Sequence, residues 1–233
     1  RIVIMSYACL NLRYILVIAL GSLPFSQLLH ANTNLEDDFY QAPVHDGCVL
    51  EEYTECAGAD LRGADLSNLD LRGADFSRAN LENADLRHAN LRGVNLEGAN
   101  LRGANLNRAR MINANVRGAD LSQASLVGLD SWNLFGQGAT FDGADLTGAN
   151  LEFGRLTKAS FRNATMRGAK LEMAWMNRAD LSGADLRDAN MQEAKLSMSS
   201  LNDADLSGAR LHYGNFQLVQ MRGCIACPVD WMD

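Results

Sequence analysis

A hydrophobic residue recurs at every fifth position over most of this chain. From Leu61 to Met221 this position, i, occurs 33 times, and 31 of its occupants are Leu, Met, Phe or Val, the exceptions being Ser131 and Gly136. Two positions earlier, at i−2, 25 of the 33 residues are alanine. A helix would rotate successive i residues by roughly 140° and scatter them around its axis, and a strand would send them to opposite faces. The chain must therefore turn once in every pentapeptide.

The other positions of the pentapeptide supply those turns. Position i−1 is rich in Asp and Asn and position i+2 in Gly and Asn, residues whose side chains or permissive backbones favour tight turns. We expect the i−2 and i side chains to point inward and the rest outward. Stacked coils of this kind bury a column of leucines with alanines between them and pair the backbone groups of neighbouring coils.

Phrases such as Ala-Asp-Leu-Arg-Gly, Ala-Asp-Leu-Ser-Asn and Ala-Asn-Leu-Glu-Asn resemble the repeats of the pentapeptide repeat family, and the resemblance extends over residues 57–223. The family motif is a small residue, Asp or Asn, Leu or Phe, and two variable polar residues. The resemblance implies an all-β fold, a right-handed quadrilateral parallel β-helix with four faces per coil and about eight coils. With a rise of about 4.8 Å per coil, this solenoid would be about 40 Å long.

Segments of different composition flank the repeats. Residues 1–31 are predicted to be a signal peptide, because the apolar stretch at 14–25 is too short to span a membrane and a small residue, Ala31, follows it. A retained anchor or a buried helix is the alternative. Residues 32–56 are expected to form an acidic N-terminal cap and 224–233 a C-terminal cap. The protein is then exported to the periplasm, the extracellular space or, in a photosynthetic bacterium, the thylakoid lumen, with no integral membrane segment after signal removal.

Residues 126–141 disturb the repeat. In this stretch leucine stands at i−2, at Leu129 and Leu134, and a small residue stands at i, at Ser131 and Gly136. The register resumes afterwards with no residue gained or lost. A loop would account for this, but so would a continuous coil in which the large and small residues have exchanged places at constant core volume, and we favour the coil.

The sequence predicts no catalytic centre, cofactor site or metal site, so the protein is not expected to be an enzyme. His88 and His212 occupy outward positions in separate coils, no Ser/His/Asp or Cys/His set can be assembled, and an axis filled by Leu and Ala leaves no pocket. His45 and Cys48 could join a metal site, but no second ligand pair accompanies them.

Four cysteines lie next to the two ends of the repeats. Bridged α-carbons must lie within about 7 Å, and the solenoid separates its ends by much more, so we predict that Cys48 pairs with Cys56 and Cys224 with Cys227. The alternative for Cys56 is a free buried thiol, because it sits on an extrapolated i position. A redox role for the motif Cys224-Ile-Ala-Cys227-Pro is a weaker hypothesis.

The twenty-residue coil that the resemblance implies aligns the outward aromatic residues near one edge. The predicted interaction patch includes aromatic residues and one arginine placed to stack between two rings. Its members are Trp132, Phe135, Phe153, Arg155, Met173, Trp175 and Tyr213. Coverage of this patch by residues 32–56 or by the C-terminal tail is the alternative.

The net charge of −7 raises a second function class. Some members of the resembled family mimic DNA and inhibit or protect gyrase, and such members are acidic. Here residues 57–223 hold 19 acidic and 19 basic residues, so the acidity lies in the flanks. We therefore predict a structural or protein-binding module of the cell envelope or secreted space with an unidentified protein partner, and keep the DNA-mimicking gyrase ligand as the alternative. Binding to nucleic acid is not expected. An end-to-end homodimer is left open.

Overall fold

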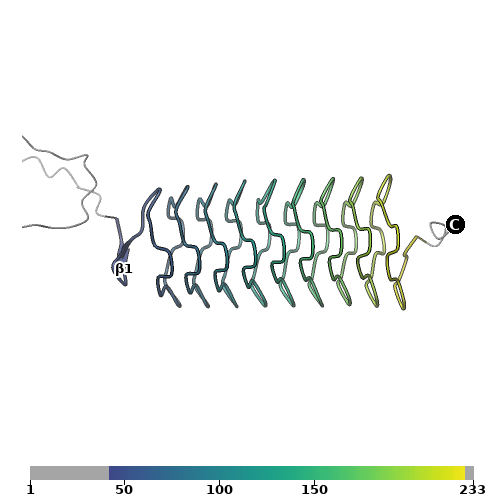
Figure 1. Cartoon of the computed structure of the whole chain (residues 1–233), viewed down its shortest axis with the longest axis horizontal. Coiled ribbons are helices and arrows are strands. Elements are labelled where there is room, and N and C mark those ends of the chain that lie inside the picture. The colour runs from purple at the N-terminus through teal and green to yellow at the C-terminus, as the bar shows by residue number, and fades with distance from the viewer. Residues whose placement is uncertain (1–41, 229–233) are drawn as a thin grey trace, which may run out of the picture. The chain divides into compact units, whose positions relative to one another are not determined.

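The computed structural model describes residues 42–228, which form one solenoid preceded by a short hairpin (Figure 1). Strand β1 (Val44–His45) pairs antiparallel with β2 (Cys48–Val49), with Val44 opposite Val49. The coils contain no longer strands. Each side contributes a single parallel bridge to the coil above and below it, from Glu55 and Asp75 to Asp205 and Ile225. The predicted signal peptide, residues 32–41 of the acidic extension and residues 229–233 lie outside the described residues.

Every bridge joins residues twenty apart in the sequence, and bridge residues recur at every fifth position. Four pentapeptides therefore complete one coil, and the four i−1 residues of a coil begin four separate columns. This is the predicted right-handed quadrilateral β-helix, an all-β fold. The coils run from Glu55 to Ile225, two residues beyond the predicted repeat at each end.

Each pentapeptide satisfies its backbone by one repeated set of hydrogen bonds. Leu86, at i, donates its N–H to the carbonyl of Asn105 in the next coil at 2.7 Å, and Asp85, at i−1, donates to Ala64 in the preceding coil at 2.9 Å. The turn is closed by the N–H of Ala89 and the carbonyl of Leu86 at 3.1 Å. The N–H at i+1 is taken by a side chain, since Arg87 donates its N–H to Oδ1 of Asp85 at 3.1 Å. The preference for Asp and Asn at i−1 thus has a direct cause.

The core is the predicted column of large i residues with small i−2 residues between them. Leu61, Leu86 and Ala89 are buried, and the same holds along nearly the whole solenoid. Phe141 and Phe161 lie one coil apart on the same side, and their rings stack with centroids 4.7 Å apart and planes at 3°. Close packing of this kind excludes water from the axis and leaves the outward side chains as the only chemically variable surface.

Residues 126–141 form a regular coil, as favoured from the sequence. The bridges continue through Asp130 and Phe135 without interruption, and Leu134 is buried although it stands at i−2. A Cβ on Gly136 would lie 2.9 Å from Cδ2 of Leu156 and 3.3 Å from Cγ2 of Val116. Cδ2 of Leu134 lies 3.8 Å from the same position, so Gly136 stands where Leu156, Val116 and Leu134 together leave no room for a larger side chain.

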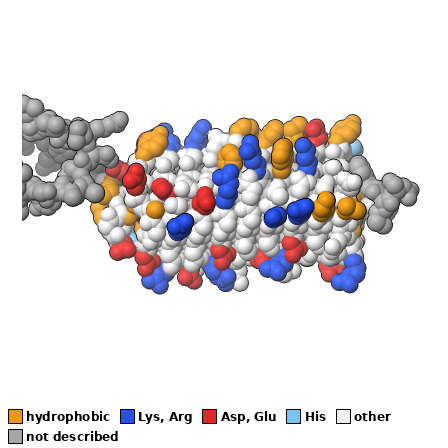
Figure 2. Space-filling model, in the orientation of Figure 1, with side chains coloured by type: hydrophobic (Ala, Val, Ile, Leu, Met, Phe, Trp, Pro, Cys, Tyr) orange, Lys and Arg blue, Asp and Glu red, His pale blue; other side chains and the backbone are white. Residues whose placement is uncertain are grey.

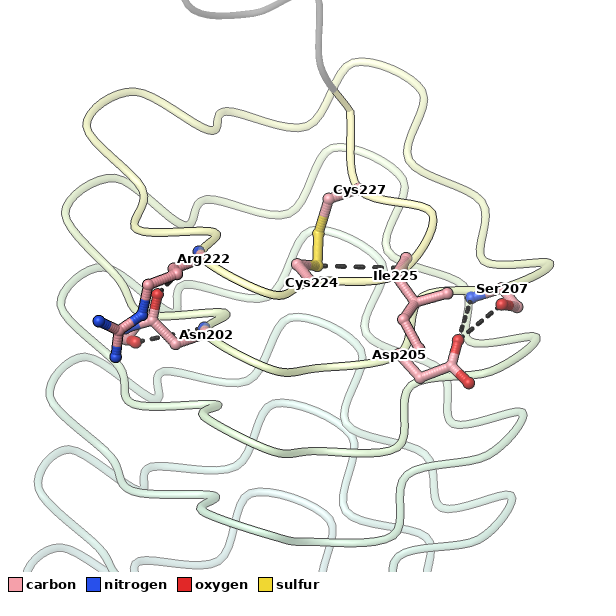
Figure 3. Close-up of a disulfide and its surroundings, with 8 residues drawn as sticks. Asn202, Asp205, Ser207, Arg222, Cys224, Ile225 and Cys227 are labelled. Carbon is pink, nitrogen blue, oxygen red and sulfur yellow. Dashed lines mark hydrogen bonds between the residues drawn. A yellow bond between two sulfur atoms is a disulfide. The ribbon is translucent and has the colours of Figure 1, made fainter.

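The hairpin covers the N-terminal end of the core. Leu50 is buried after β2, and its N–H bonds to the carbonyl of Pro43 at 2.7 Å. Cys48 and Cys56 are joined with α-carbons 5.6 Å apart, which ties the hairpin to the first coil. At the other end, Cys224 and Cys227 are joined with α-carbons 5.9 Å apart (Figure 3). These are the two cysteine pairs predicted from the sequence. That both pairs are oxidised in the protein stays a prediction.

Removing the first bridge should loosen the N-terminal end. Cys48→Ala with Cys56→Ala is expected to cost about 2.5 kcal/mol of unfolding free energy, because closing a loop of this length restricts the unfolded chain by about that amount. Hydrogen exchange should locate the loss at residues 42–60. The matched control, Cys224→Ala with Cys227→Ala, closes a shorter loop and should cost less. Equal exchange at the N-terminal end with and without reductant would show that Cys48 and Cys56 are not bridged.

Candidate interaction surface

One side of the solenoid carries most of the predicted patch. Its i−1 column runs through bridged residues from one end of the coils to the other, and we call this side, with the turn on either edge, the aromatic face. The column contains Glu55, Asp75, Asn95, Asn115, Phe135, Arg155, Trp175, Lys195 and Asn215. Figure 2 shows hydrophobic and basic side chains side by side over the half of the solenoid nearer the C-terminal end.

The rings of this column are paired with cations. The guanidinium carbon of Arg155 lies 4.9 Å from the ring centroid of Phe135, and that of Arg117 lies 5.2 Å from the same centroid. Arg155 was expected between Phe135 and Trp175 and stacks on Phe135. Trp175 takes Lys195 instead, with Nζ 4.7 Å from the ring centroid. Such contacts attract a cation to an aromatic ring and hold it in place.

The turn that leads into the column carries the remaining patch residues. Trp132 and Phe153 lie with ring centroids 5.5 Å apart and planes at 56°. Phe153 is 41% exposed, Trp175 50% and Tyr213 83%. Met173 is partly buried, and the ring of Tyr213 lies 6.4 Å from that of His212. The structure therefore places Trp132, Phe135 and Phe153 close together, and Tyr213 near the C-terminal end of the same face.

The aromatic face breaks the side-chain rule that stabilises the turns elsewhere. Asp75, Asn95, Asn115 and Asn215 each accept the N–H of the residue two positions on, at 2.9–3.2 Å. Phe135, Arg155, Trp175 and Lys195 interrupt this series, and none of them carries a side-chain acceptor. In the other columns of the described coils, residues other than Asp, Asn, Ser or Thr occur only singly. Each of them is bridged only to Asp, Asn, Ser or Thr in the adjacent coils. Local rules are typically broken in this way where a surface has another use.

The backbone of the turns adds a cost that the aromatic face shares with other turns, where His88, Arg108 and Gln123 also occupy position i+2. Position i+2 has a positive φ throughout, which glycine and asparagine tolerate best. On the aromatic face this position holds Phe153 at 59°, Met173 at 55° and Tyr213 at 60°. Bulky residues are unfavourable in this region by about 1 kcal/mol or more. The chain thus accepts a cost in stability to place these side chains outward.

Two substitutions of Trp175 separate the loss of its ring from the absence of a turn acceptor at its position. We expect Trp175→Asn to be more stable than Trp175→Ala by about 1 kcal/mol, because the amide oxygen can accept the N–H of Asn177 as Asn215 does for Gln217. Both variants remove the ring that Lys195 contacts, so they are matched in what they take from the surface. Urea denaturation of the two proteins measures the difference. Equal stabilities would mean that the missing acceptor costs nothing.

The most acidic column is largely neutralised by arginines. It contains Asp65, Asp85, Asp145, Asp185 and Asp205. Arg87 pairs with Asp85 at 2.5 Å, and Asp185 is paired with Arg167 at 2.5 Å and Arg187 at 2.8 Å. The hydrogen bonds from Arg87 hold the pKa of Asp85 below its ordinary value. Because neutral residues interrupt this column and arginines beside it pair with its carboxylates, it does not resemble the continuous charge of a phosphate backbone.

A different carboxylate, Asp142, links two coils and should make stability depend on pH. Burial raises its pKa, but hydrogen bonds from Arg162 and Ser160 outweigh this and hold the pKa below its ordinary value. A carboxyl with a lowered pKa stabilises the fold above about pH 4, and this contribution is lost as the pH falls through the lower folded pKa. Asp142→Asn is therefore expected to be less stable at neutral pH and to lose less stability on acidification. Parallel pH profiles for both proteins would contradict this.

Within residues 42–228 no set of groups suited to catalysis or metal binding was found. His88 and His212 are exposed in separate coils, and no three potential ligands gather around one point. His45 lines a wide, open hollow with Asp46, Asp60 and Arg62, and these groups do not gather into a set that could hold a metal ion. No helix long and apolar enough to cross a membrane occurs in the same stretch.

Sequence reasoning found the aromatic members of the surface and missed much of its positive charge. Lys195 stands on Trp175 and Arg117 on Phe135, and neither was among the predicted residues. Both lie in the columns that the twenty-residue coil defines, so reading those columns for cations as well as for rings would have found them. Side-chain packing determines which ring each cation contacts, and the sequence does not predict it.

Comparisons with known proteins agree with the architecture. A family model described as pentapeptide repeats matches residues 54–93, 89–128, 137–163, 144–183, 166–203 and 189–225, with eight copies. Among solved structures, HetL, a pentapeptide repeat protein involved in heterocyst differentiation regulation from Nostoc sp. strain PCC 7120, is 32% identical. The match covers 74% of this chain and 87% of HetL, with a TM-score of 0.56.

Two further structures are similar over different extents. A pentapeptide repeat protein from the Arabidopsis thaliana thylakoid lumen is 29% identical, covering 40% of this chain and 68% of its own, with a TM-score of 0.38. QnrB1, a plasmid-mediated fluoroquinolone resistance protein, is 16% identical, covering 75% of this chain and 91% of its own, with a TM-score of 0.41. The search of curated protein sequences gave no significant match.

Proposed function

Because the chain belongs to the pentapeptide repeat family, we propose that it is a non-enzymatic protein-interaction module whose aromatic face binds a partner protein. The sequence of residues 1–31 further supports an exported protein that acts in the cell envelope or the secreted space. The solenoid would serve as a rigid support that presents ordered columns of side chains.

The observation that carries the proposal is the run of Phe135, Arg155, Trp175 and Lys195 at positions where the fold favours Asp or Asn. These four residues gain no turn hydrogen bond, and their side chains stay at the surface. Exposed aromatic residues with arginine are also the residue types most enriched at the centres of protein interfaces. A surface that costs local stability and has this composition is better suited to binding than to folding.

The rest of the fold supports such a role by keeping the face rigid. Each column position is held by backbone hydrogen bonds to the coils above and below, for example Trp175 N–H to Gly154 at 2.8 Å and Met176 N–H to Lys195 at 2.8 Å. The side chains therefore require little ordering when a partner binds, which reduces the entropic cost of association.

A capture experiment with paired variants tests the proposed surface. The full-length protein, tagged at its C-terminus, is used to capture proteins from the cell fraction in which it is found. Phe135→Ala with Trp175→Ala should lose a specific partner, whereas His88→Ala with Arg108→Ala, exposed on a different turn, should retain it. Circular dichroism checks that both variants are folded. Equal capture by the two variants would exclude the aromatic face as the binding surface.

The location of the same tagged protein tests the cellular compartment. Export should be accompanied by loss of residues 1–31, which mass spectrometry of the mature N-terminus detects. Retention in the cytoplasm with an intact N-terminus would contradict the envelope role and would return attention to intracellular targets. Mapping of nonreduced peptides from this sample also reports whether Cys48 is bound to Cys56.

A further inference from the structure

The charges of the aromatic face reverse sign between its two halves. In the central column Glu55 and Asp75 lie in the N-terminal half, and Arg155 and Lys195 lie in the C-terminal half. Phe135 is the middle member of the column.

The charges on the two turns that border the column also change sign between the two halves of the solenoid. On the turn that follows the column, Glu97 lies in the N-terminal half, and Lys158 and Arg178 lie in the C-terminal half. On the turn that precedes it the order is inverted, with basic residues first and acidic residues later. These are Arg72 and Arg92, followed by Glu152, Glu172 and Glu193. The exceptions are Glu52, which is ion-paired with Arg72, and two basic residues on the following turn in the N-terminal half, Arg78 and Arg117.

Four basic residues in the C-terminal half lack an acidic partner within the described part of the chain. No carboxylate oxygen lies within 4.0 Å of Arg155, Lys158, Arg178 or Lys195. Some arginines on other sides are paired, such as Arg87 and Arg162, and others, such as Arg108 and Arg110, are not. A face can carry one sign of charge at one end and the opposite sign at its other end. Such a face is electrostatically complementary to a second copy of itself that lies antiparallel to it.

From this pattern we infer that the aromatic face binds a second copy of the chain, packed antiparallel. The two copies would be related by a two-fold axis that passes across the face near Phe135, perpendicular to the long axis of the solenoid. Each edge of the face then lies opposite the same edge of the second copy, and the N-terminal half lies opposite the C-terminal half. In that register Asp75 faces Lys195 of the second copy, whereas Glu55 and Arg155 face asparagines. On the edges Glu97 faces Arg178, and Arg92 faces Glu172. Parallel packing would instead place Glu55, Asp75, Arg155 and Lys195 against their own copies, which is repulsive.

The apolar residues of the face are placed as such an interface requires. Trp132, Phe135 and Phe153 lie beside the middle of the column, where Arg117 and Arg155 stack on Phe135. Aromatic residues and arginine are the residue types enriched at the centre of protein interfaces. The face extends along the whole solenoid, about 40 Å at a rise of about 4.8 Å per coil, which is long enough for an interface of standard size. This inference rests on the proposed function, because it names the occupant of the same surface.

Charge reversal at each half, followed by mixing, tests the inference with the full-length mature protein. Light scattering and sedimentation should show a dimer at micromolar concentration. Asp75→Lys with Glu97→Lys, and separately Arg178→Glu with Lys195→Glu, should each weaken self-association at least about tenfold, because each pair of changes places like charges opposite one another in the antiparallel dimer. An equimolar mixture of the two variants should restore the dimer, since the reversed halves are again opposite in sign.

Other outcomes of the same measurements would overturn it. A wild-type protein that stays monomeric, or a mixture that does not restore association, excludes antiparallel packing on this face. A dimer that resists both charge reversals and is lost in Ile225→Asp, at the C-terminal end of a different column, would join the molecules end to end. If the protein is monomeric while Phe135→Ala with Trp175→Ala still loses a captured partner, only the self-association fails and the proposed function stands. If neither association nor capture depends on the face, both fail.

Discussion

Gly136→Leu is expected to destabilise the solenoid by about 3 kcal/mol or more, although it restores the residue type found at nearly every other i position. The added side chain would enter space already filled, since even a Cβ at this position would lie 2.9 Å from Leu156. Leu134→Ala alone should also cost about 2–5 kcal/mol, because it leaves a cavity where a buried leucine packs. Denaturant unfolding monitored by circular dichroism measures both losses.

The double variant is the decisive measurement. Leu134→Ala with Gly136→Leu recreates the usual arrangement of a small i−2 and a large i residue, so it should recover about 3 kcal/mol of the combined loss as coupling energy. Gly136→Leu combined with Leu86→Ala, more than two coils away, is the control and should be additive. If both combinations are additive, Leu134 and Gly136 do not share one volume and the exchange is incidental.

Phe161→Ala should produce the other large loss, about 3–5 kcal/mol. Phe161 is fully buried and stacks on Phe141 at 4.7 Å between ring centroids, so truncation removes both a large apolar side chain and an aromatic pair. Phe161→Leu should cost only about 1.5 kcal/mol, because leucine occupies the same side of neighbouring coils at Leu121 and Leu181.

The comparison between these two variants shows which property of Phe161 matters. A loss for Phe161→Leu as large as that for Phe161→Ala would mean that the ring pair itself, rather than filled volume, holds these coils together. Phe141→Leu with Phe161→Leu then completes the cycle, and it isolates the contribution of stacking, expected at about 1 kcal/mol. Hydrogen exchange at residues 121–181 would show whether the loss stays within the coils that the rings join.

The fold could be predicted from the sequence because each pentapeptide repeats the same physical requirements. Leucine at i and alanine at i−2 determine which side chains are buried, and Asp or Asn at i−1 supplies the acceptor that the N–H at i+1 needs. Even the exchange at Leu134 and Gly136 was readable, since the register is preserved. The number of sides per coil could not be predicted in this way, because a period of five residues does not determine it. That number came from the family resemblance.

The candidate surface could be predicted only in part. Columns twenty residues apart located Phe135, Arg155 and Trp175, but they did not indicate that Lys195 rather than Arg155 would lie on Trp175. That choice is made by rotamers and neighbouring side chains at the surface, where the sequence constrains packing least. The missing turn hydrogen bonds became visible only once the acceptor role of i−1 was known, and they remain the clearest sign that the face is used.

The four-sided coil has a consequence for how such a protein can change. Because five residues build one side and twenty build one coil, adding a single pentapeptide between two coils would keep all later leucines inside but would swing every later side chain by a quarter turn about the long axis. Adding twenty would only move them along it. The azimuth of a surface feature is thus encoded by residue count. Inserting one pentapeptide after Asn115 would carry Phe135 and Trp175 to the adjacent side, away from Glu55 and Asp75, with the core chemistry unaltered.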